Sequence, residues 1–218
     1  MPTAAFAQDA SNIWSGGYIG LDLGGGMGSV SVTDNVNDGV PPGPFDYTTK
    51  DLVADLKGGF NLQAGAFVLG LEGKVGYLDP IGSGIVPSSN PGHHQDLTIT
   101  PGATAELTGH VGIGIDKTLL YVKGGAVIFG GSAQQVTDNP GYKTDPSGAF
   151  TGWTAGLGIE QMLSDKMGLT AEYAHTVYSP VTADQENVGD PSSPLGYKFL
   201  NWTSFSTDTI TVGVNVLY

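Results

Sequence analysis

The sequence contains no cysteine, and its eight basic residues are all lysine, because arginine does not occur. Without cysteine, neither disulfides nor thiolate metal sites can form. The formal net charge is −13, with 21 acidic residues against those eight lysines. Nucleic-acid binding requires a basic surface, so we predict no nucleic-acid partner.

Long apolar runs are missing as well. No stretch approaches the roughly 18 apolar residues that a membrane helix needs. Charged residues make up 13% of the chain, glycine is abundant at 35 residues, and the mean hydropathy is −0.00, which is too apolar for disorder. Membrane β-barrels have a mean hydropathy near zero because apolar lipid-facing residues alternate with polar lumen-facing ones. A secreted β-sandwich can share this composition. At 218 residues, one all-β domain is expected.

One stretch, Gly152–Tyr178, shows the pattern most clearly. Two alternating arms flank the short polar turn Ser164–Lys166, which predicts an antiparallel hairpin. The apolar face carries large residues: Trp153, Ala155, Leu157, Ile159, Leu169, Ala171 and Tyr173. The other face carries small polar residues and one glutamate per arm, Glu160 and Glu172. Such a face suits a narrow polar interior, with the apolar face turned to lipid.

The same alternation recurs along the chain between connections that are alternately long and short. Long Pro- and Gly-containing loops are expected at 33–51, 79–96, 131–151 and 179–205. Tight turns are expected near 64–66, at Asp116-Lys117 and at 164–166. This asymmetry is typical of outer-membrane barrels, which have short periplasmic turns and longer outer loops. We therefore predict an all-β fold, an eight-stranded antiparallel up-and-down transmembrane β-barrel.

The N-terminus resembles the end of a secretory signal. Ala5-Phe6-Ala7 fits the small-x-small cleavage pattern, with Gln8 as the first mature residue. We expect residues 1–7 to be a residual signal-peptide tail and residues 8–218 to form the barrel domain. An alanine-rich flexible terminus is the alternative.

Charged residues on the inward face are predicted to form an interior charge plug with a structural role. They are Asp55, Lys57, Glu72, Lys74, Glu106, Lys123, Glu160 and Glu172. Buried charges are costly unless paired, so we expect Glu160 and Glu172 to find lysines on other strands. A narrow ion path is the alternative, although side chains fill a barrel of eight strands.

Histidine supplies the remaining candidate chemistry. His93 and His94 lie together in an expected loop and are candidates for haem or metal binding, but no third ligand stands at a recognisable spacing. His110 is expected inside, hydrogen-bonded within the plug, and His175 in an interfacial aromatic belt with Tyr173. No histidine has a nucleophile placed beside it, since His175-Thr176-Val177 offers no serine two places on. We therefore predict neither an enzyme nor a cofactor.

Several segments together resemble the small outer-membrane barrels of alphaproteobacteria, the porin-family proteins similar in fold to the OmpA membrane domain. The segments are Trp14–Gly20, Val68–Tyr77, Leu119–Gly125, Gly152–Glu160, Leu169–Tyr173 and Thr209–Tyr218. Members tend to carry inward arginines at positions matching Thr108, His110, Thr170 and Thr211. This chain has none there, so the resemblance implies no arginine-dependent pore lining.

The resemblance implies a protein of the bacterial outer membrane that supports the envelope and contacts lipopolysaccharide. We expect a structural barrel whose acidic surface loops bind divalent cations that bridge lipopolysaccharide. A narrow channel or a haemin-binding surface protein is the alternative, and a soluble sandwich lectin or adhesin is a third interpretation.

Overall fold

A computed structural model describes residues 12–33, 44–81, 83–87, 94–137, 142–144, 149–180, 182–187 and 198–218. The predicted signal tail, residues 1–7, and the start of the predicted barrel domain at Gln8 lie outside these ranges. Eight long strands carry the fold: β1 Gly16–Thr33, β2 Pro44–Ala64, β3 Phe67–Ile81, β5 His94–Ile115, β6 Thr118–Thr137, β8 Phe150–Ser164, β9 Met167–Tyr178 and β11 Lys198–Leu217. Three short strands are added at one end: β4 Ser83–Pro87, β7 Tyr142–Thr144 and β10 Thr182–Asn187.

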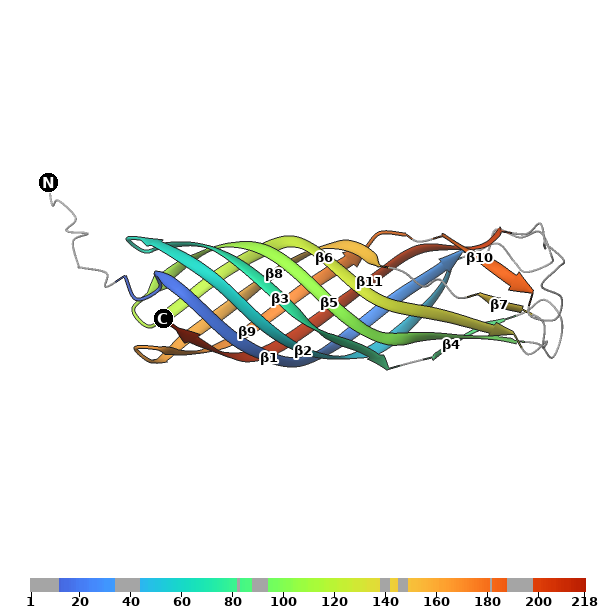
Figure 1. Ribbon diagram of the computed structural model, residues 1–218, viewed down its shortest axis with the longest axis horizontal. Helices are drawn as coiled ribbons and strands as arrows, with labels where there is room; N and C mark the ends of the chain where they lie inside the picture. Colours follow the sequence, from blue (N-terminus) through green and yellow to red (C-terminus); the bar gives the residue numbers. More distant parts are fainter. Residues whose placement is uncertain are drawn as a thin grey trace, which may run out of the picture.

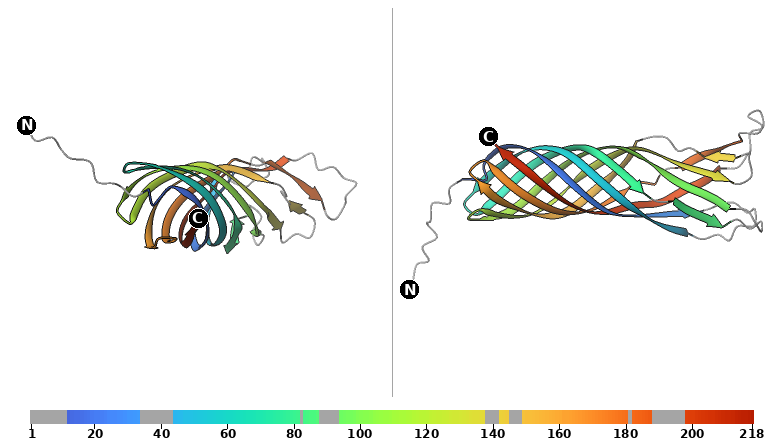
Figure 2. Two further views of the ribbon diagram at one scale, coloured as in Figure 1. Left: turned by 60° about the vertical axis from the view of Figure 1, so that its left-hand side comes forward. Right: turned by 90° about the horizontal axis from the view of Figure 1, so that it is seen from below.

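The eight long strands form a closed antiparallel barrel (Figures 1 and 2). Each pairs with the next long strand along the chain, and β11 returns to pair with β1. Following cross-strand partners once around the wall leads from Ile19 to Ser29, ten residues further along β1. A stagger of this size tilts the strands by roughly 40° and leaves an interior that side chains fill. The predicted eight-stranded barrel is therefore confirmed.

Connections at the two ends of the barrel differ. Two-residue turns join β2 to β3, β5 to β6 and β8 to β9. Gly65 and Asp116 occupy two of these turns with φ of 64° and 50°, the left-handed region that tight hairpin turns require. The C-terminus lies at the same end, where the Tyr218 amide donates to the Gly17 carbonyl at 3.0 Å (Figure 1). The described residues contain no helix long and apolar enough to cross a membrane.

The predicted bounds of the long loops are wrong, because the strands extend several residues into the stretches that were expected to be loops. Residues 44–51, 79–81, 94–96, 131–137 and 198–205 belong to the long strands, and β4, β7 and β10 lie within the remaining stretches. Ladder pairing continues there without an apolar outer face: Thr48 and Lys50 point outward, while Thr49 and Asp51 are buried. Hydrophobic alternation shows only the part of a strand that faces lipid.

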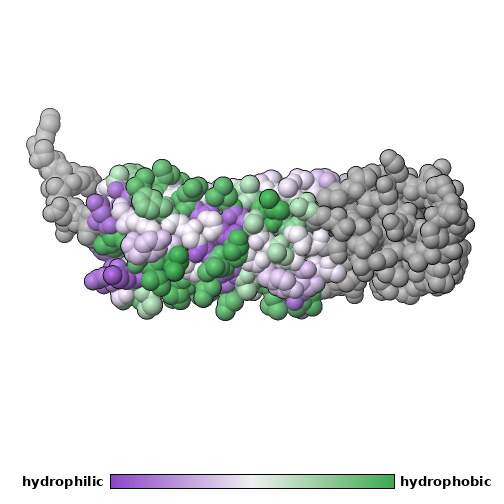
Figure 3. All heavy atoms as spheres, viewed as in Figure 1, coloured by the Kyte–Doolittle hydropathy of each residue, from purple (hydrophilic) through white to green (hydrophobic). Residues whose placement is uncertain are grey.

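The wall itself alternates as predicted. Outward apolar side chains are exposed along every long strand. As examples, Leu23 is 68% exposed, Leu157 57% and Ile210 64%. Green hydrophobic residues cover much of the described wall in Figure 3. Inward partners such as Thr154, Glu160, Thr170 and Glu172 are buried. The fold is thus inside-out relative to a water-soluble protein, as a membrane barrel requires.

Apolar side chains close the interior at both ends. At the short-turn end, the tryptophan cluster consists of Trp14, Val68, Leu119 and Met162. At the opposite end, the aromatic cluster consists of Val30, Leu78, Val127, Phe129, Phe150, Tyr178 and Phe205. Phe205 stacks on Tyr178 with ring centroids 4.9 Å apart, and Phe129 contacts both rings. Polar residues occupy the space between the two clusters.

Candidate functional site

Between the two apolar clusters lies a charged layer, defined as Asp22, Lys57, Glu72, Lys74, Glu106, Lys123 and Glu172. These side chains come from β1, β2, β3, β5, β6 and β9 and meet in the middle of the barrel. Each lysine is almost fully enclosed, with side-chain exposures of 0%, 6% and 2% for Lys57, Lys74 and Lys123. An isolated charge in such surroundings is very costly. The folded barrel can therefore be stable only if these charged side chains are paired with one another.

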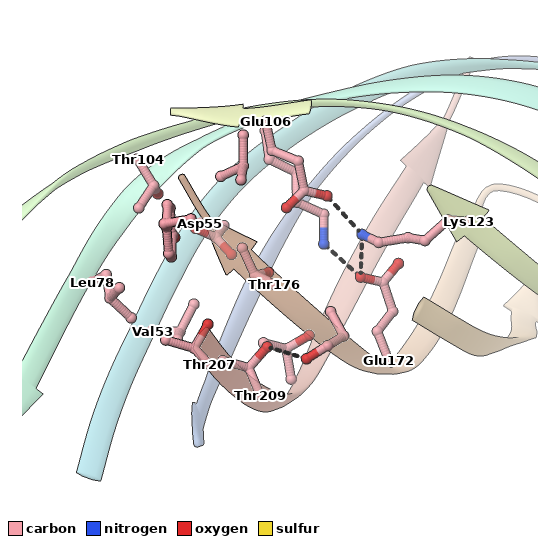
Figure 4. A pocket seen from close by; sticks show the side chains of 15 residues that line it. Val53, Asp55, Leu78, Thr104, Glu106, Lys123, Glu172, Thr176, Thr207 and Thr209 are labelled. Carbon is pink, nitrogen blue, oxygen red and sulfur yellow. Dashed lines mark hydrogen bonds and ion pairs between the residues drawn. The ribbon is translucent and has the colours of Figure 1, made fainter. Parts of the chain in front are cut away.

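Glu172 of the hairpin β8–β9 is the centre of the charged layer. Its Oε2 contacts the ammonium groups of Lys74 and of Lys123, the latter at 3.0 Å. Its Oε1 accepts a hydrogen bond from the Tyr121 hydroxyl. Lys123 also reaches Glu106 at 3.1 Å (Figure 4) and Glu72 at 3.5 Å. Two lysines on different strands thus converge on one carboxylate that β9 supplies.

Asp22 holds the other side of the charged layer and was not among the predicted plug residues. Its two oxygens take different lysines: Lys57 at 2.7 Å and Lys74 at 2.9 Å. The alternation of β1 does place it on the polar face with Tyr18 and Gly20. The signal was therefore present in the sequence. Lys74, which contacts both Asp22 and Glu172, links the two halves of the layer.

Two tyrosines connect the carboxylates to the wall in the same manner. Tyr18 lies across Gly59 on the neighbouring strand and donates its hydroxyl to Glu72 Oε2 at 2.7 Å. Tyr121 lies across Gly158 and donates to Glu172. A Cβ at either glycine would approach the ring to about 2.5 Å or less, so neither position tolerates a side chain without moving the tyrosine. The glycine on the inward face is what lets each ring lie flat against the strand.

Not every predicted plug residue joins the ion pairs. Among the described residues, Glu160 has no lysine partner and instead accepts a hydrogen bond from the Asn215 amide at 3.0 Å. The expectation that a lysine pairs with Glu160 is therefore wrong. Asp55 faces inward without an ion pair in the described part of the chain, although Lys74 lines the same cavity. Glu160 and Asp55 thus lie at the margins of the charged layer.

A cavity of about 60 Å³ lies between the charged layer and the aromatic cluster. Charged side chains including Asp55, Lys74, Glu106 and Glu172 border it on one side, and Leu78, Val127 and Tyr178 on the other. Threonines of β9 and β11 line its wall: Thr211 and the three labelled in Figure 4, Thr176, Thr207 and Thr209. The space suffices for a few water molecules and is lined by polar groups that can hold them.

The histidines take three different positions. His110 lies inside, with Nε2 2.9 Å from Asn61 Oδ1 and its ring beside Tyr121. His175 lies on the outer wall near Tyr173, as expected for the interfacial belt. His93 falls outside the described residues, and His94 is the first residue of β5, paired through its backbone with Pro87. The described residues contain no group of three or more metal-binding side chains. The haem or metal prediction for His93 and His94 therefore stays a prediction.

The four inward positions for which the family resemblance implied arginine hold threonine or histidine. Thr108, His110, Thr170 and Thr211 are all buried, between 1% and 7% exposed. Thr170 accepts a hydrogen bond from Lys57 at 3.3 Å and itself contacts Asp22 at 3.4 Å. The three interior lysines are the only inward cations among the described residues.

Fold, lipid-facing wall and filled polar interior together define an outer-membrane β-barrel protein. Comparison with known proteins identifies the family: residues 1–216 match the family model of the outer membrane protein beta-barrel domain, and the chain belongs to that family. Its place is therefore the bacterial outer membrane, where the barrel wall is surrounded by lipid.

Two relatives carry the same description, 25 kDa outer-membrane immunogenic protein. The one from Brucella ovis is 30% identical over 187 residues, covering 85% of this chain and 78% of the relative. The one from Brucella abortus is 29% identical over 194 residues, covering 85% and 79%. Among solved structures, Neisserial surface protein A aligns with 94% of this chain and 98% of its own, at 10% identity and a TM-score of 0.47.

Proposed function

We propose that this protein is a structural component of the outer membrane, a closed barrel that supports the envelope and displays acidic loops. The charged layer carries the proposal, because its lysines and carboxylates are engaged with one another instead of lining an open path. Apolar clusters above and below the layer add to the barrier. A barrel of this stagger has no room for a wide aqueous channel as well.

The proposal extends to non-catalytic surface contacts. A net charge of −13 favours divalent cations at the outer surface, where they would bridge to the phosphates of lipopolysaccharide. The names of the two Brucella relatives describe an outer-membrane antigen and no reaction. We accordingly infer that the protein has no catalytic activity.

Planar-bilayer conductance tests the closed interior. The purified barrel is expected to insert without producing steps of current at moderate voltage. As a matched control, a triple variant Lys74→Ala, Lys123→Ala, Glu172→Ala removes side chains that border the cavity and should show more current. Stable conductance steps from the unmodified protein would contradict the structural proposal and favour the narrow-channel alternative.

A further inference from the structure

A second group of polar side chains lies on the outer wall, away from the charged layer. Tyr173 and His175 of β9 both contact Asp208 of β11. The Tyr173 hydroxyl donates to Asp208 Oδ1, and His175 Nδ1 lies 2.9 Å from the same oxygen. Trp153 of β8 packs edge-on against the His175 ring, with centroids 6.1 Å apart. The side chains of His175 and Asp208 are 39% and 49% exposed, so this group faces the membrane environment.

The depth of the group follows from the outward residues of β11. Moving away from the short-turn end, these are Val216, Val214, Val212 and Ile210, and the next is Asp208. Val216 and Asp208 are eight residues apart, or about 20 Å along the axis for a strand tilted by roughly 40°. An outer-membrane barrel has an apolar band about 25 Å tall, with its short turns on the periplasmic side. Asp208 therefore lies at the outer-leaflet edge of the band.

An outward lysine stands close to this group at the same edge. Met27 of β1 pairs with Asp208 on one side and with Lys50 of β2 on the other. Lys50 is thus two strands from Asp208, or about 10 Å at the usual strand spacing. It follows the apolar outward residues Leu56, Ala54 and Leu52 on its own strand. The Lys50 side chain makes no hydrogen bond or ion pair with any other described residue.

The chemistry of the group selects a lipid. Both donors converge on Asp208 Oδ1, and no described side chain donates to Oδ2, which is left as an acceptor facing the membrane. The ester linkages of glycerophospholipids present only acceptors and cannot donate to that oxygen. A lipid with amide N–H and hydroxyl groups at this depth can donate to it. If the lipid also carries a phosphate further out, Lys50 is placed to pair with that phosphate.

We propose that Tyr173, His175 and Asp208, together with Lys50, form a binding site for a phosphorylated, amide-linked glycolipid of the outer leaflet. Asp208 accepts from the amide or hydroxyl groups, Tyr173 and His175 hold the carboxylate in place, and Lys50 contacts the phosphate. The inference deepens the proposed structural role by naming a lipid and a site on the barrel wall, and it rests on that role only for the placement in the membrane.

The test measures binding of purified lipid A, a phosphorylated amide-linked glycolipid, to the full chain in detergent micelles by native mass spectrometry. Phosphatidylcholine serves as the ester-linked comparison, because it has no N–H or O–H donor. The unmodified protein should bind lipid A in preference. Asp208→Ala should weaken lipid A binding roughly tenfold, the size of one lost hydrogen bond to a charged group, and leave phosphatidylcholine binding unchanged. Lys50→Gln should weaken binding of lipid A but not of its dephosphorylated form.

Asp165→Ala is the control, because Asp165 is an exposed carboxylate in the short turn between β8 and β9, at the end of the barrel far from Asp208 and Lys50. It should bind lipid A as the unmodified protein does. Heat-modifiable gel mobility verifies that each variant is folded. Equal loss in Asp208→Ala and Asp165→Ala, or equal binding of both lipids, would overturn the site. Neither result bears on conductance, so the structural proposal would stand or fall separately.

Discussion

The charged layer and the aromatic cluster fill the same barrel by opposite means. In the layer, Lys74 and Lys123 are tied to carboxylates on several strands, and each contact depends on its partners. In the cluster, Phe129 packs against Phe150, Tyr178 and Phe205 with centroids 5.9 to 6.4 Å apart, and no charge is involved. We therefore expect the loss of one charge to destabilise several ion pairs of the charged layer. The aromatic cluster should instead be destabilised by changes in side-chain volume.

The largest expected effect comes from removing the charge of Glu172. Glu172→Gln leaves Lys74 and Lys123 without their shared carboxylate, and we expect it to lower the free energy of unfolding by roughly 3 kcal/mol. Glu160→Gln is the matched control, because Glu160 contacts an amide and no lysine among the described residues, and it should cost less than about 1 kcal/mol. Urea titrations in the same detergent give both values. An equal loss of unfolding free energy in the two variants would show that pairing with lysine does not determine the stability of the charged layer.

A smaller loss is expected from Tyr121→Phe. The ring keeps its place over Gly158, but the hydrogen bond from the hydroxyl to Glu172 disappears. A hydrogen bond to a charged group contributes about 2 kcal/mol. A double-mutant cycle with Glu172→Gln should show coupling between the two positions, measured again by urea titration. Additive effects would mean that the hydroxyl contact contributes nothing.

The aromatic cluster should respond to shape and be indifferent to charge. Phe129→Leu keeps an apolar side chain but loses three ring contacts, and we expect a cost of about 1.5 kcal/mol. Ile128→Leu, on the lipid face of the same strand, is the control and should be nearly neutral. Thermal unfolding monitored by circular dichroism compares the two. A greater loss for Ile128→Leu would contradict the placement of Phe129 inside.

The smallest effect is expected at Asp55, which has no ion pair in the described part of the structure. Neutralising a half-buried carboxylate that has no ion pair should change the free energy of unfolding by less than about 1 kcal/mol in either direction. Asp55→Asn and Asp22→Asn make the matched pair, since both carboxylates face inward and only Asp22 binds two lysines. If Asp55→Asn cost as much as Asp22→Asn, an unrecognised partner of Asp55 would have to exist.

Alternation alone predicted which face of each strand is polar, because lipid contact imposes a period of two on any membrane strand. It placed Glu172, Lys74 and Lys123 inside correctly. It could not predict which of them touch, since partners such as Lys74 and Glu172 are 98 residues apart and meet across the barrel. That requires the stagger of the closed sheet, which the alternation does not contain. The same limit explains the error at Glu160, whose position in the barrel brings it to Asn215 and leaves it beyond ion-pair distance of the described lysines.

Strand length was the other quantity that the pattern missed. Once a strand leaves the lipid, nothing forces its outer face to be apolar, and residues such as Thr48 and Lys50 read as loop. Lys50 and Asp208 lie where that change occurs. The point at which a sequence stops alternating therefore marks the membrane boundary, not the end of the strand.

Nuclear magnetic resonance of the lysine ammonium groups tests the filled interior most directly. The protein has only eight lysines and no arginine, so the ¹⁵N-lysine spectrum is simple. We predict that Lys57, Lys74 and Lys123 give ammonium signals that exchange slowly with water at neutral pH, and that Glu172→Gln accelerates exchange at Lys74 and Lys123. If none of the three were protected from exchange in the unmodified protein, the interior would be open to water and the charged layer would not be the plug that we propose.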